Sequence, residues 1–342
     1  MTKHFLILLF VIISTGTSYS RPFLSDTLVV AFWNLENLFD TINDPMKNDE
    51  DFLPEGKQKW NAKRYDEKLT KLASVIRLMN EGRGPDILGV CEIENELVLA
   101  DLSGKYLEEF GYEIVHIEGP DERSIDVSLF FKKDKFRFLA KTGHKVELPS
   151  GSPTRLILEI DMLYAGHIPI TFFVNHWPSR RGGSEESERN RIKSASVLRS
   201  RIDTLLKTDA NSRIIIMGDF NDEPQNISIE SILGAKNFEC NGDKSGINVL
   251  NNLSYTQKQA GFGSYKYRDQ WNMLDQIIIS SALLEGSLSY ICNSFEVFKP
   301  GIMIIRSGQY QGAPDRTYAG EKYLGGFSDH FPVIAKFIYI SK

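Results

Sequence analysis

The chain has 342 residues, of which 42 % are apolar, 25 % charged and 11 % aromatic, which is sufficient for a globular core of ordinary size. This length suits two domains or one large α/β sandwich or barrel. The net charge of −5 comes from 40 Lys and Arg against 45 Asp and Glu, and the sequence has no basic block. A basic nucleic-acid-binding tail is therefore excluded, and any phosphate chemistry must use a local patch or a bound cation.

The N-terminus has the order of a secretory signal peptide. Lys3 precedes the apolar residues 5–13, and the small and polar residues 14–20 follow. The apolar run is too short to span a bilayer easily. We therefore predict a signal peptide over residues 1–20 and a soluble mature protein that is secreted or periplasmic; the alternative is a buried N-terminal strand.

The sequence contains three cysteines, Cys91, Cys240 and Cys292. An odd and sparse count argues against a disulfide scaffold. Cys91 ends an apolar run and is predicted to be a small core residue. Whether Cys240 and Cys292 form a bridge in an oxidising compartment stays open.

Short apolar runs alternate with helical patterns along the rest of the chain. Residues 44–59 look like a polar surface excursion. One helix is predicted from Asn61, a suitable N-cap, with apolar residues spaced alternately four and three apart from Tyr65 to Met79. A second helix is predicted over residues 185–206, with Glu185 at its positive end. Strands are predicted at 28–33, 86–91, 112–116, 127–131, 136–140, 155–161, 170–175, 213–217, 274–279 and 331–338.

These elements indicate an α/β fold. The strands are β-branched and nearly unbroken in their apolar character, which is typical of strands covered on both faces. Many strands, with hairpin-like neighbours in the middle and helices before and after, favour two packed sheets flanked by helices. We find no repeat, no low-complexity linker and no boundary after the leader, and we predict one domain over residues 26–342.

Polar residues lie at the ends of five of the apolar strands. They follow four of these strands and precede the fifth. Any one case is explained by a polar turn, but five cases point to a site, because rigid scaffolds carry their chemistry on the loops at strand ends. The five segments are 34–37, 92–95, 175–183, the acidic cluster 219–223 and 328–330.

The residue types in these segments suit phosphate-ester hydrolysis. Glu36, Glu92 and Asp329 are hard oxygen donors, which Mg²⁺ or Mn²⁺ prefers over zinc. Asn34 and Asn221 are neutral and can orient a phosphate or a water without adding repulsion.

Four further residues are predicted to act on protons and charge. Asp219 can hold the attacking water or share its proton. His176 and His330 can stabilise the negative charge of a pentacovalent transition state, and Asp275 is a candidate to fix the tautomer of one of them. The alternative for each histidine is a hydrogen-bonded structural role.

At these residues the sequence resembles the endonuclease/exonuclease/phosphatase superfamily. The matching segments are WNLEN, DILGVCEIEN, VNHWPS, MGDFND, NMLDQIIIS and FSDHFPV, in the family's order and over nearly the whole mature chain. CEIEN and NLENLFD look most like its bacterial extracellular nuclease branch. The resemblance implies a four-layer α/β/β/α sandwich of two packed, mostly antiparallel sheets flanked by helices.

The resemblance also implies roles for individual residues. One side of the site, called the metal side below, would hold one Mg²⁺-type ion, or two, with Mn²⁺ or Ca²⁺ as alternatives. Many members have Asp where this chain has Glu36, so this longer side chain is expected to reach the metal through water. The implied metal residues are Asn34, Glu36, Glu92 and Asp329, and the implied catalytic residues are His176, Asp219, Asn221, Asp275 and His330.

Substrate contacts are predicted around the same segments. Arg123, Arg181 and Arg316 can each clamp a phosphate with two hydrogen bonds, although each can equally be a solvated surface charge. Ser179 lies in the loop that follows His176. Trp271 is predicted to contact a sugar or base of the substrate, and Tyr265 and Tyr267 nearby can stack on bases. The alternative for each of these aromatic residues is packing in the core.

The combined prediction is a secreted, divalent-metal-dependent phosphoesterase. The favoured function is that of an endonuclease that hydrolyses DNA or RNA. The alternative is a phosphatase or phosphodiesterase for a small or lipid phosphate ester, such as a phosphoinositide or sphingomyelin. A catalytically silent binding protein is disfavoured because the metal carboxylates and both histidines are present. We infer no stable protein partner and expect a monomer.

Overall fold

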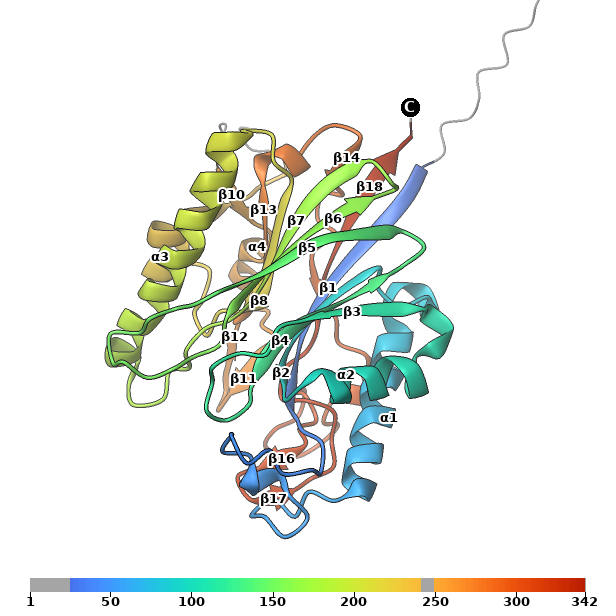
Figure 1. Cartoon of the computed structure of the whole chain (residues 1–342), viewed down its shortest axis with the longest axis vertical. Coiled ribbons are helices and arrows are strands. Elements are labelled where there is room, and N and C mark those ends of the chain that lie inside the picture. The colour runs from blue at the N-terminus through green and yellow to red at the C-terminus, as the bar shows by residue number, and fades with distance from the viewer. Residues whose placement is uncertain (1–24, 241–248, 342) are drawn as a thin grey trace, which may run out of the picture.

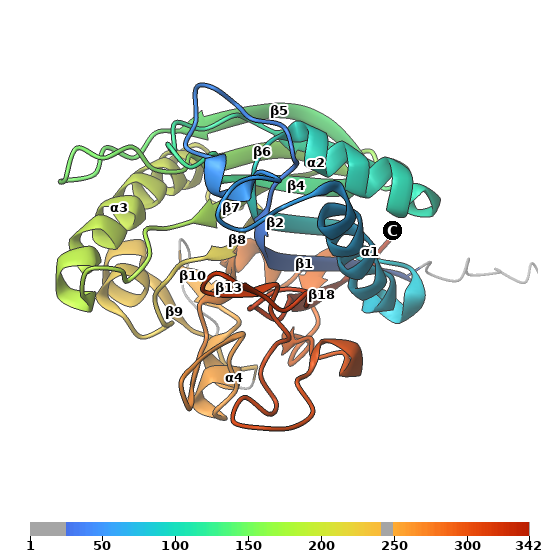
Figure 2. The same cartoon turned by 90° about the horizontal axis from the view of Figure 1, so that it is seen from below.

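The computed structural model describes residues 25–240 and 249–341, in which two sheets pack face to face with helices outside them (Figure 1). Figure 2 shows α3 (Ser184–Thr208) on one flank and α1 (Ala62–Leu78) and α2 (Glu96–Asp101) on the opposite flank. The predicted four-layer sandwich is therefore confirmed. The predicted signal peptide over residues 1–20 lies outside the described residues. None of the helices described is both long enough and apolar enough to cross a membrane.

The first sheet has the strand order β14-β18-β1-β2-β4-β3, with β15 also paired to β18. β1 and β2 are parallel, and the other pairs are antiparallel. Its strands are β1 (Ser25–Leu38), β2 (Ile87–Ile93), β3 (Tyr112–His116), β4 (Asp126–Lys132), β14 (Leu288–Tyr290), β15 (Glu296–Val297) and β18 (Val333–Ile340).

The second sheet has the order β5-β6-β7-β8-β13-β10-β9, with parallel pairs at β7/β8 and β10/β9. Two small hairpins, β11–β12 and β16–β17, lie outside both sheets. The strands of the second sheet are β5 (Phe136–His144), β6 (Ile157–Tyr164), β7 (Ile168–His176), β8 (Ile214–Asp219), β9 (Ala235–Asn237), β10 (Leu250–Asn252) and β13 (Asp275–Ser280), and the hairpin strands are β11 (Tyr265–Tyr267), β12 (Gln270–Asn272), β16 (Tyr318–Ala319) and β17 (Lys322–Tyr323).

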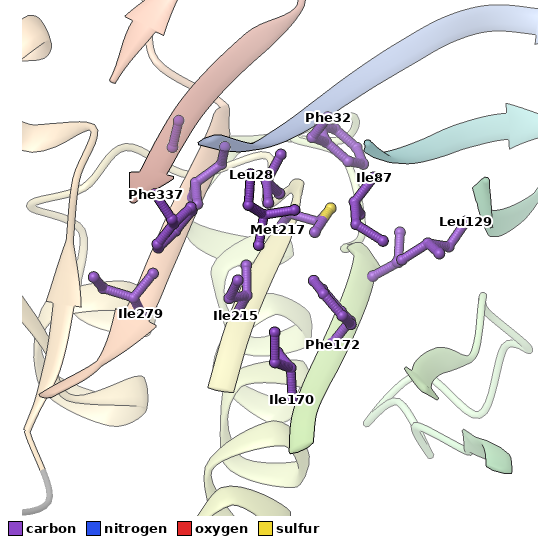
Figure 3. Close-up of a cluster of buried hydrophobic side chains, with 14 of the residues drawn as sticks. Leu28, Phe32, Ile87, Leu129, Ile170, Phe172, Ile215, Met217, Ile279 and Phe337 are labelled. Atoms are coloured by element: carbon purple, nitrogen blue, oxygen red, sulfur yellow. The ribbon is translucent and has the colours of Figure 1, made fainter. Parts of the chain in front are cut away.

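The alternation of side chains along β1 explains why both of its faces are apolar. Leu28 and Phe32 point between the sheets, where they pack with residues of the second sheet such as Phe172 and Met217 (Figure 3). Val29, Ala31 and Trp33 point the other way into a second core that contains Leu69, Leu72 and Ile76 of α1. A third core joins α3 to the outer face of the second sheet. The sequence of a strand that is covered on both faces is therefore an unbroken run of apolar residues.

All ten predicted strands and both predicted helices are present, with ends that differ by a few residues. The Asn61 side chain caps α1 by accepting from the Arg64 N–H at 3.1 Å. The segment 44–59 is more than a polar excursion, since Phe52 stacks on Phe39 with ring centroids 4.2 Å apart. The strands that the sequence did not indicate are two or three residues long, too short to show a periodicity.

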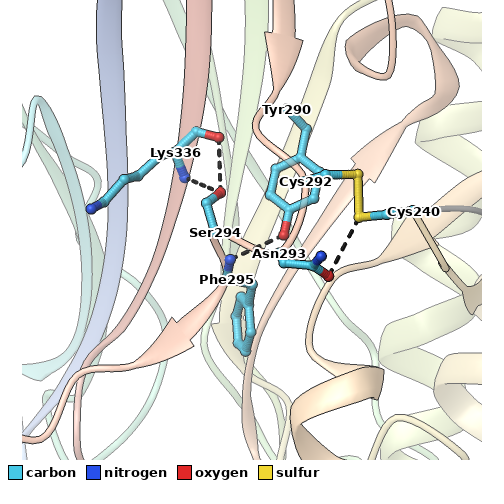
Figure 4. The surroundings of a disulfide bond; sticks show 7 residues. All are labelled: Cys240, Tyr290, Cys292, Asn293, Ser294, Phe295 and Lys336. Atoms are coloured by element: carbon cyan, nitrogen blue, oxygen red, sulfur yellow. Dashed lines mark hydrogen bonds between the residues drawn. A yellow bond between two sulfur atoms is a disulfide. The ribbon is translucent and has the colours of Figure 1, made fainter.

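Cys240 and Cys292 form a disulfide with their Cα atoms 5.7 Å apart (Figure 4). This resolves the question left open by the sequence. Cys91 is free and buried, as predicted, and belongs to the core between the sheets. The bridge ties the segment that follows β9 to the segment that follows β14.

Removing this bridge is expected to lower the free energy of unfolding by about 2–4 kcal/mol, because it closes a loop with a sequence separation of 52 and so restricts the unfolded chain. Urea unfolding of the oxidised protein, the reduced protein and the Cys240→Ser/Cys292→Ser variant measures the effect. Adding reductant to the variant should change nothing further. An oxidised protein no more stable than the variant would contradict the prediction.

Candidate active site

The strand pairing brings the polar strand ends to one end of the sandwich. β1 and β2 run parallel, so Asn34, near the end of β1, and Glu92, near the end of β2, lie at the same edge of the sheet. In the second sheet His176 pairs with Asp219 across β7/β8, and Asp219 pairs with Asp275 across β8/β13. The sequence separation of these residues is large, and packing of the two sheets makes them neighbours.

The backbone turns sharply at these strand ends. Glu36, Asn37, Glu92 and Asn221 have φ angles of 50°, 53°, 58° and 51°, in the left-handed region that residues with a Cβ seldom adopt. Such conformations cost free energy and cluster at functional sites, where the surrounding structure holds them in place. Here they turn polar side chains out of the apolar layers.

A cleft of about 640 Å³ opens at this end of the molecule. It collects nine of the predicted site residues, whereas Asn34, Glu36 and Asp275 lie behind its wall and Trp271 and Arg316 lie outside its lining. The nine are Glu92, Arg123, His176, Ser179, Arg181, Asp219, Asn221, Asp329 and His330.

Asn34 connects the two acidic sides of the cleft. Its buried side-chain amide donates to Glu92 Oε1 and to Asp219 Oδ2, both at 3.1 Å. Its oxygen accepts from the N–H of Glu36 at 2.9 Å. The second oxygen of Glu92 accepts from the N–H of Asn37 at 3.0 Å. The neutral amide thus fixes two carboxylates that would otherwise repel each other.

Glu36 is turned away from the cleft. Its buried carboxylate accepts from the N–H groups of Thr317 at 2.6 Å and Tyr318 at 3.1 Å. Burial and the nearby Asp329 carboxylate raise the pKa of Glu36 to about 7, against the opposing effects of Lys68 and the two amides. Among the predicted metal carboxylates, Glu92 and Asp329 are therefore the two that line the cleft.

Asp275 and His330 form a buried pair. Asp275 Oδ2 lies 2.6 Å from His330 Nδ1, and the Tyr265 ring stacks on the imidazole with centroids 4.7 Å apart. Burial lowers the pKa of His330, but the carboxylates of Asp275, Asp329 and Asp219 outweigh it and hold that pKa well above the usual imidazole value. His330 is therefore a cation that presents Nε2 towards Asp219 Oδ2, 4.0 Å away.

His176 has the opposite charge preference. Burial, together with the Arg155 and Arg123 guanidinium groups and His330, holds the pKa of His176 well below its usual value. Its Nε2 lies 3.8 Å from Asp219 Oδ2 and 3.9 Å from Glu92 Oε1. The cleft thus contains one neutral and one charged imidazole, on either side of Asp219.

Asp219 stands between the histidines. Burial raises the pKa of Asp219 to about 7; the charge of His330 opposes the rise, as does the N–H of Asn221, which donates to Oδ1 at 2.9 Å. Asn221 also donates its side-chain amide to the Trp177 carbonyl at 2.9 Å, which fixes its direction. A carboxyl group that titrates near neutral pH is suited to exchange a proton with a water.

The other acidic residues of the 219–223 cluster have structural partners. Asp222 pairs with Arg191 at 2.8 Å and with Arg180 at 3.3 Å. Glu223 accepts from Lys258 Nζ at 2.8 Å and from the Met273 N–H at 3.0 Å. These two carboxylates therefore build the loop, and they are absent from the lining of the cleft.

Two predicted substrate contacts do not line the cleft. Trp271 stacks on Phe331 with centroids 6.0 Å apart and is covered by Lys299, whose Nζ lies 4.2 Å from the ring centroid. Its neighbours Gln270 and Asn272 line the cleft instead, because successive residues of a strand point to opposite sides. Arg316 lies 3.8 Å from Asp329 and hydrogen-bonds Tyr265, so it orients two residues that line the cleft.

Arg155 is a residue of the site that the sequence did not indicate. It is buried and donates to the carbonyls of His176 at 3.1 Å and Trp177 at 2.7 Å, and to Asp121 at 3.2 Å. Asp121 in turn pairs with Arg123 at 3.3 Å. An arginine at the start of an apolar strand has no local signal that separates it from a surface charge.

The residues of the cleft fit a divalent cation. Three carboxylates, those of Glu92, Asp219 and Asp329, face one hollow, and they supply the hard oxygen donors that Mg²⁺ and Mn²⁺ prefer. The pKa of the Asp219 carboxylate is raised, which means that the surrounding protein does not fully stabilise its negative charge.

Comparison with known proteins agrees with this fold. A sequence model of the endonuclease/exonuclease/phosphatase family matches residues 29–342. No curated protein sequence matches the chain.

Solved structures share its fold over most of their length. D. rerio TDP2 complexed with single-strand DNA product has a TM-score of 0.55 at 16 % identity and covers 91 % of this chain and 98 % of its own. The human nocturnin catalytic domain with bound sulfate has a TM-score of 0.53 at 15 % identity, covering 93 % and 97 %. The mannosyl-6-phosphatase Bt3783 of Bacteroides thetaiotaomicron has a TM-score of 0.54 at 18 % identity, covering 91 % and 99 %.

The sandwich and its site define a phosphoesterase, a hydrolase that acts on phosphoester bonds. The chain belongs to the endonuclease/exonuclease/phosphatase family. Enzymes of this family typically depend on a divalent metal.

Proposed function

We propose that the protein is an exported, Mg²⁺- or Mn²⁺-dependent phosphodiesterase that hydrolyses DNA or RNA as an endonuclease. The observation that carries the proposal is the pairing of Asp219 with two imidazoles of opposite charge preference beside the Glu92 and Asp329 carboxylates. Arginines and tyrosines line the same cleft, and these suit phosphate and nucleobases respectively. The fold is shared with TDP2 complexed with single-strand DNA product, which supports a nucleic-acid substrate.

In the proposed reaction Asp219 holds a water and accepts its proton as the water oxygen attacks phosphorus in line. The bond from phosphorus to the ester oxygen on the opposite side breaks, and that oxygen leaves as an alcohol after taking up a proton from water. Asn221 orients the phosphate. The His330 imidazolium, held by Asp275, stabilises the charge that develops on the phosphate oxygens, and neutral His176 donates a hydrogen bond to them. A cation held by Glu92 and Asp329 would supply neutralisation of the phosphate oxygens.

Two further properties belong to the proposal. The leader at residues 1–20 and the Cys240–Cys292 bridge both suit an oxidising compartment, which supports export to the periplasm or the medium. The family match over residues 29–342 supports one domain over residues 26–342. We propose that this domain acts as a monomer.

A second candidate is a phosphatase for a small phosphate ester, favoured by the likeness to the mannosyl-6-phosphatase Bt3783. It would use the same proton and charge chemistry. The two candidates differ in the size of the group beyond the phosphate, which the loops around the cleft decide.

We expect the purified protein with Mg²⁺ to hydrolyse bis-nitrophenyl phosphate and plasmid DNA, and to lose at least 100-fold in rate (about 2.7 kcal/mol or more of transition-state stabilisation) when EDTA is added. Parallel assays with single-stranded DNA, RNA, inositol phosphates, mannose 6-phosphate and sphingomyelin rank the substrates. Activity that survives EDTA would contradict the metal requirement. Preference for a phosphomonoester over every nucleic acid would establish the second candidate instead.

A further inference from the structure

Lys68 is a buried lysine on α1 that joins three separate segments of the site. It is 2 % exposed. Its Nζ donates to the Glu36 carbonyl at 3.3 Å, the Thr317 hydroxyl at 2.7 Å and the Phe327 carbonyl at 2.6 Å. An ammonium group has three protons to donate, and these contacts use all three.

Each of the three partners is next to a residue of the metal side. Glu36 itself lies near the end of β1 in a left-handed conformation. Thr317 provides one of the two backbone N–H groups that bind the Glu36 carboxylate. Phe327 precedes Asp329 by two residues. Lys68, Thr317 and Glu36 therefore close a ring of contacts between α1, β1 and the segment 315–329.

The segment 315–329, which includes β16 and β17, depends on α1 for its position. Figure 1 shows β16 and β17 beside the N-terminal half of α1. Lys71, one turn after Lys68, donates to the Gly325 carbonyl. Arg64, one turn before it, lies over the Tyr323 ring at 4.1 Å. This segment carries Asp329 into the cleft, whereas Glu92 arrives from β2.

We propose that Lys68 is a positioning residue that holds Glu36 and Asp329 in register with Glu92, so that the site is formed before a divalent cation binds. The inference rests on the proposed metal-dependent function. It assigns the assembly of the metal side to a residue of α1 that does not line the cleft.

A purely electrostatic role for Lys68 predicts the opposite result from a positioning role. Its ammonium interacts with the carboxylates of Glu36, Asp329 and Glu92, and a positive charge repels an incoming cation. Deleting the charge alone would therefore tighten cation binding. Loss of the three hydrogen bonds would misplace Asp329, and loss of a residue that orients a ligand typically weakens metal affinity 10–100-fold.

The test is Mn²⁺ binding to Lys68→Met, measured by calorimetry and by electron paramagnetic resonance with no substrate present. We expect the Kd to rise about 10–100-fold and the backbone amides of 315–329 to exchange hydrogen faster in the metal-free protein. Lys63→Met is the matched control, because Lys63 is a lysine of the same helix with a side chain 85 % exposed, and its Kd should be unchanged. Lys71→Met, which loses the contacts with the Gly325 carbonyl and the Phe327 ring but none with Glu36, should raise the Kd less.

Thr317→Val keeps the test decisive if Lys68→Met fails to fold. It removes one acceptor of Lys68 and retains the backbone N–H that binds Glu36, so it should raise the Kd in the same direction by a smaller factor. An unchanged or lower Kd in a folded Lys68→Met protein overturns the proposal. Because binding is measured without turnover, that result would leave the proposed hydrolase function standing, whereas wild-type protein that binds no Mn²⁺ would remove both.

Discussion

Asp275→Asn is expected to lower kcat by about 10³–10⁴-fold on bis-nitrophenyl phosphate or DNA, because the change reverses the hydrogen bond that orients and charges His330. Asp275 Oδ2 lies 2.6 Å from His330 Nδ1, and both side chains are buried. An asparagine amide there would favour an imidazole with the proton on Nε2 and without a positive charge. A comparable loss of an orienting aspartate costs about 10⁴ in kcat in a hydrolase triad.

The pH dependence separates this mechanism from a general loss of structure. In the wild type the carboxylates hold the pKa of His330 well above its usual value, so the imidazolium persists through neutral pH. In Asp275→Asn that pKa falls, so the decline of the residual activity on the alkaline side should begin at a lower pH than in the wild type. Asp161→Asn is a matched control on β6, where the carboxylate accepts from the Thr171 hydroxyl at 2.6 Å and is not part of the cleft lining. Near-wild-type kcat in folded Asp275→Asn would refute the pair's role.

Asp219→Asn should lower kcat by about 10²–10⁴-fold, because an amide has no basic oxygen to accept the proton of the attacking water. The substitution keeps the shape of the side chain. The hydrogen bonds from the Asn221 N–H and from the Asn34 amide both end on carboxylate oxygens of Asp219, so one of them is lost or must turn. Single-turnover hydrolysis at saturating Mg²⁺ measures the chemical step directly.

The same variant has an expected effect on stability with a defined sign. The folded-state pKa of Asp219 is about 7, above its usual value of 3.8, so ionising the folded protein costs free energy and the stability falls as the pH rises from about 4 to 7. The difference is roughly three pKa units, or up to about 4 kcal/mol above pH 7. Metal-free Asp219→Asn should therefore unfold at a higher temperature than the wild type at pH 8.

At pH 4 the difference in unfolding temperature should be small, because Asp219 is protonated in the folded wild type and still about two-fifths protonated in the unfolded chain, where its usual pKa is 3.8. Thermal unfolding in EDTA at both pH values makes the comparison. A stability difference that is equal at pH 4 and pH 8 would show that Asp219 does not titrate near neutral pH. The predicted trade of stability for activity is common at active sites.

The ten principal strands were predictable because their signal is local. Each of these strands is covered on both faces, so its sequence is a short run of apolar residues that ends at polar ones. β1, with its two apolar faces, is the clearest example. The Asn61 cap and the α1 stripe were predictable for the same reason. The short strands β9, β10, β14 and β15 were missed, since two or three residues carry no periodicity and pair only because neighbouring strands present free edges.

The sequence by itself determined which residue types stand at the strand ends, and therefore that carboxylates, amides and histidines meet where the strands stop. The tertiary structure alone decided how they are used. It turned Glu36 towards the amides of 317 and 318, packed Trp271 on Phe331, and made Arg155 and Lys68 parts of the site. The physical reason is that a local pattern fixes the face on which a side chain lies, whereas its partner, such as Thr317 for Lys68 across 249 positions, depends on how distant segments pack.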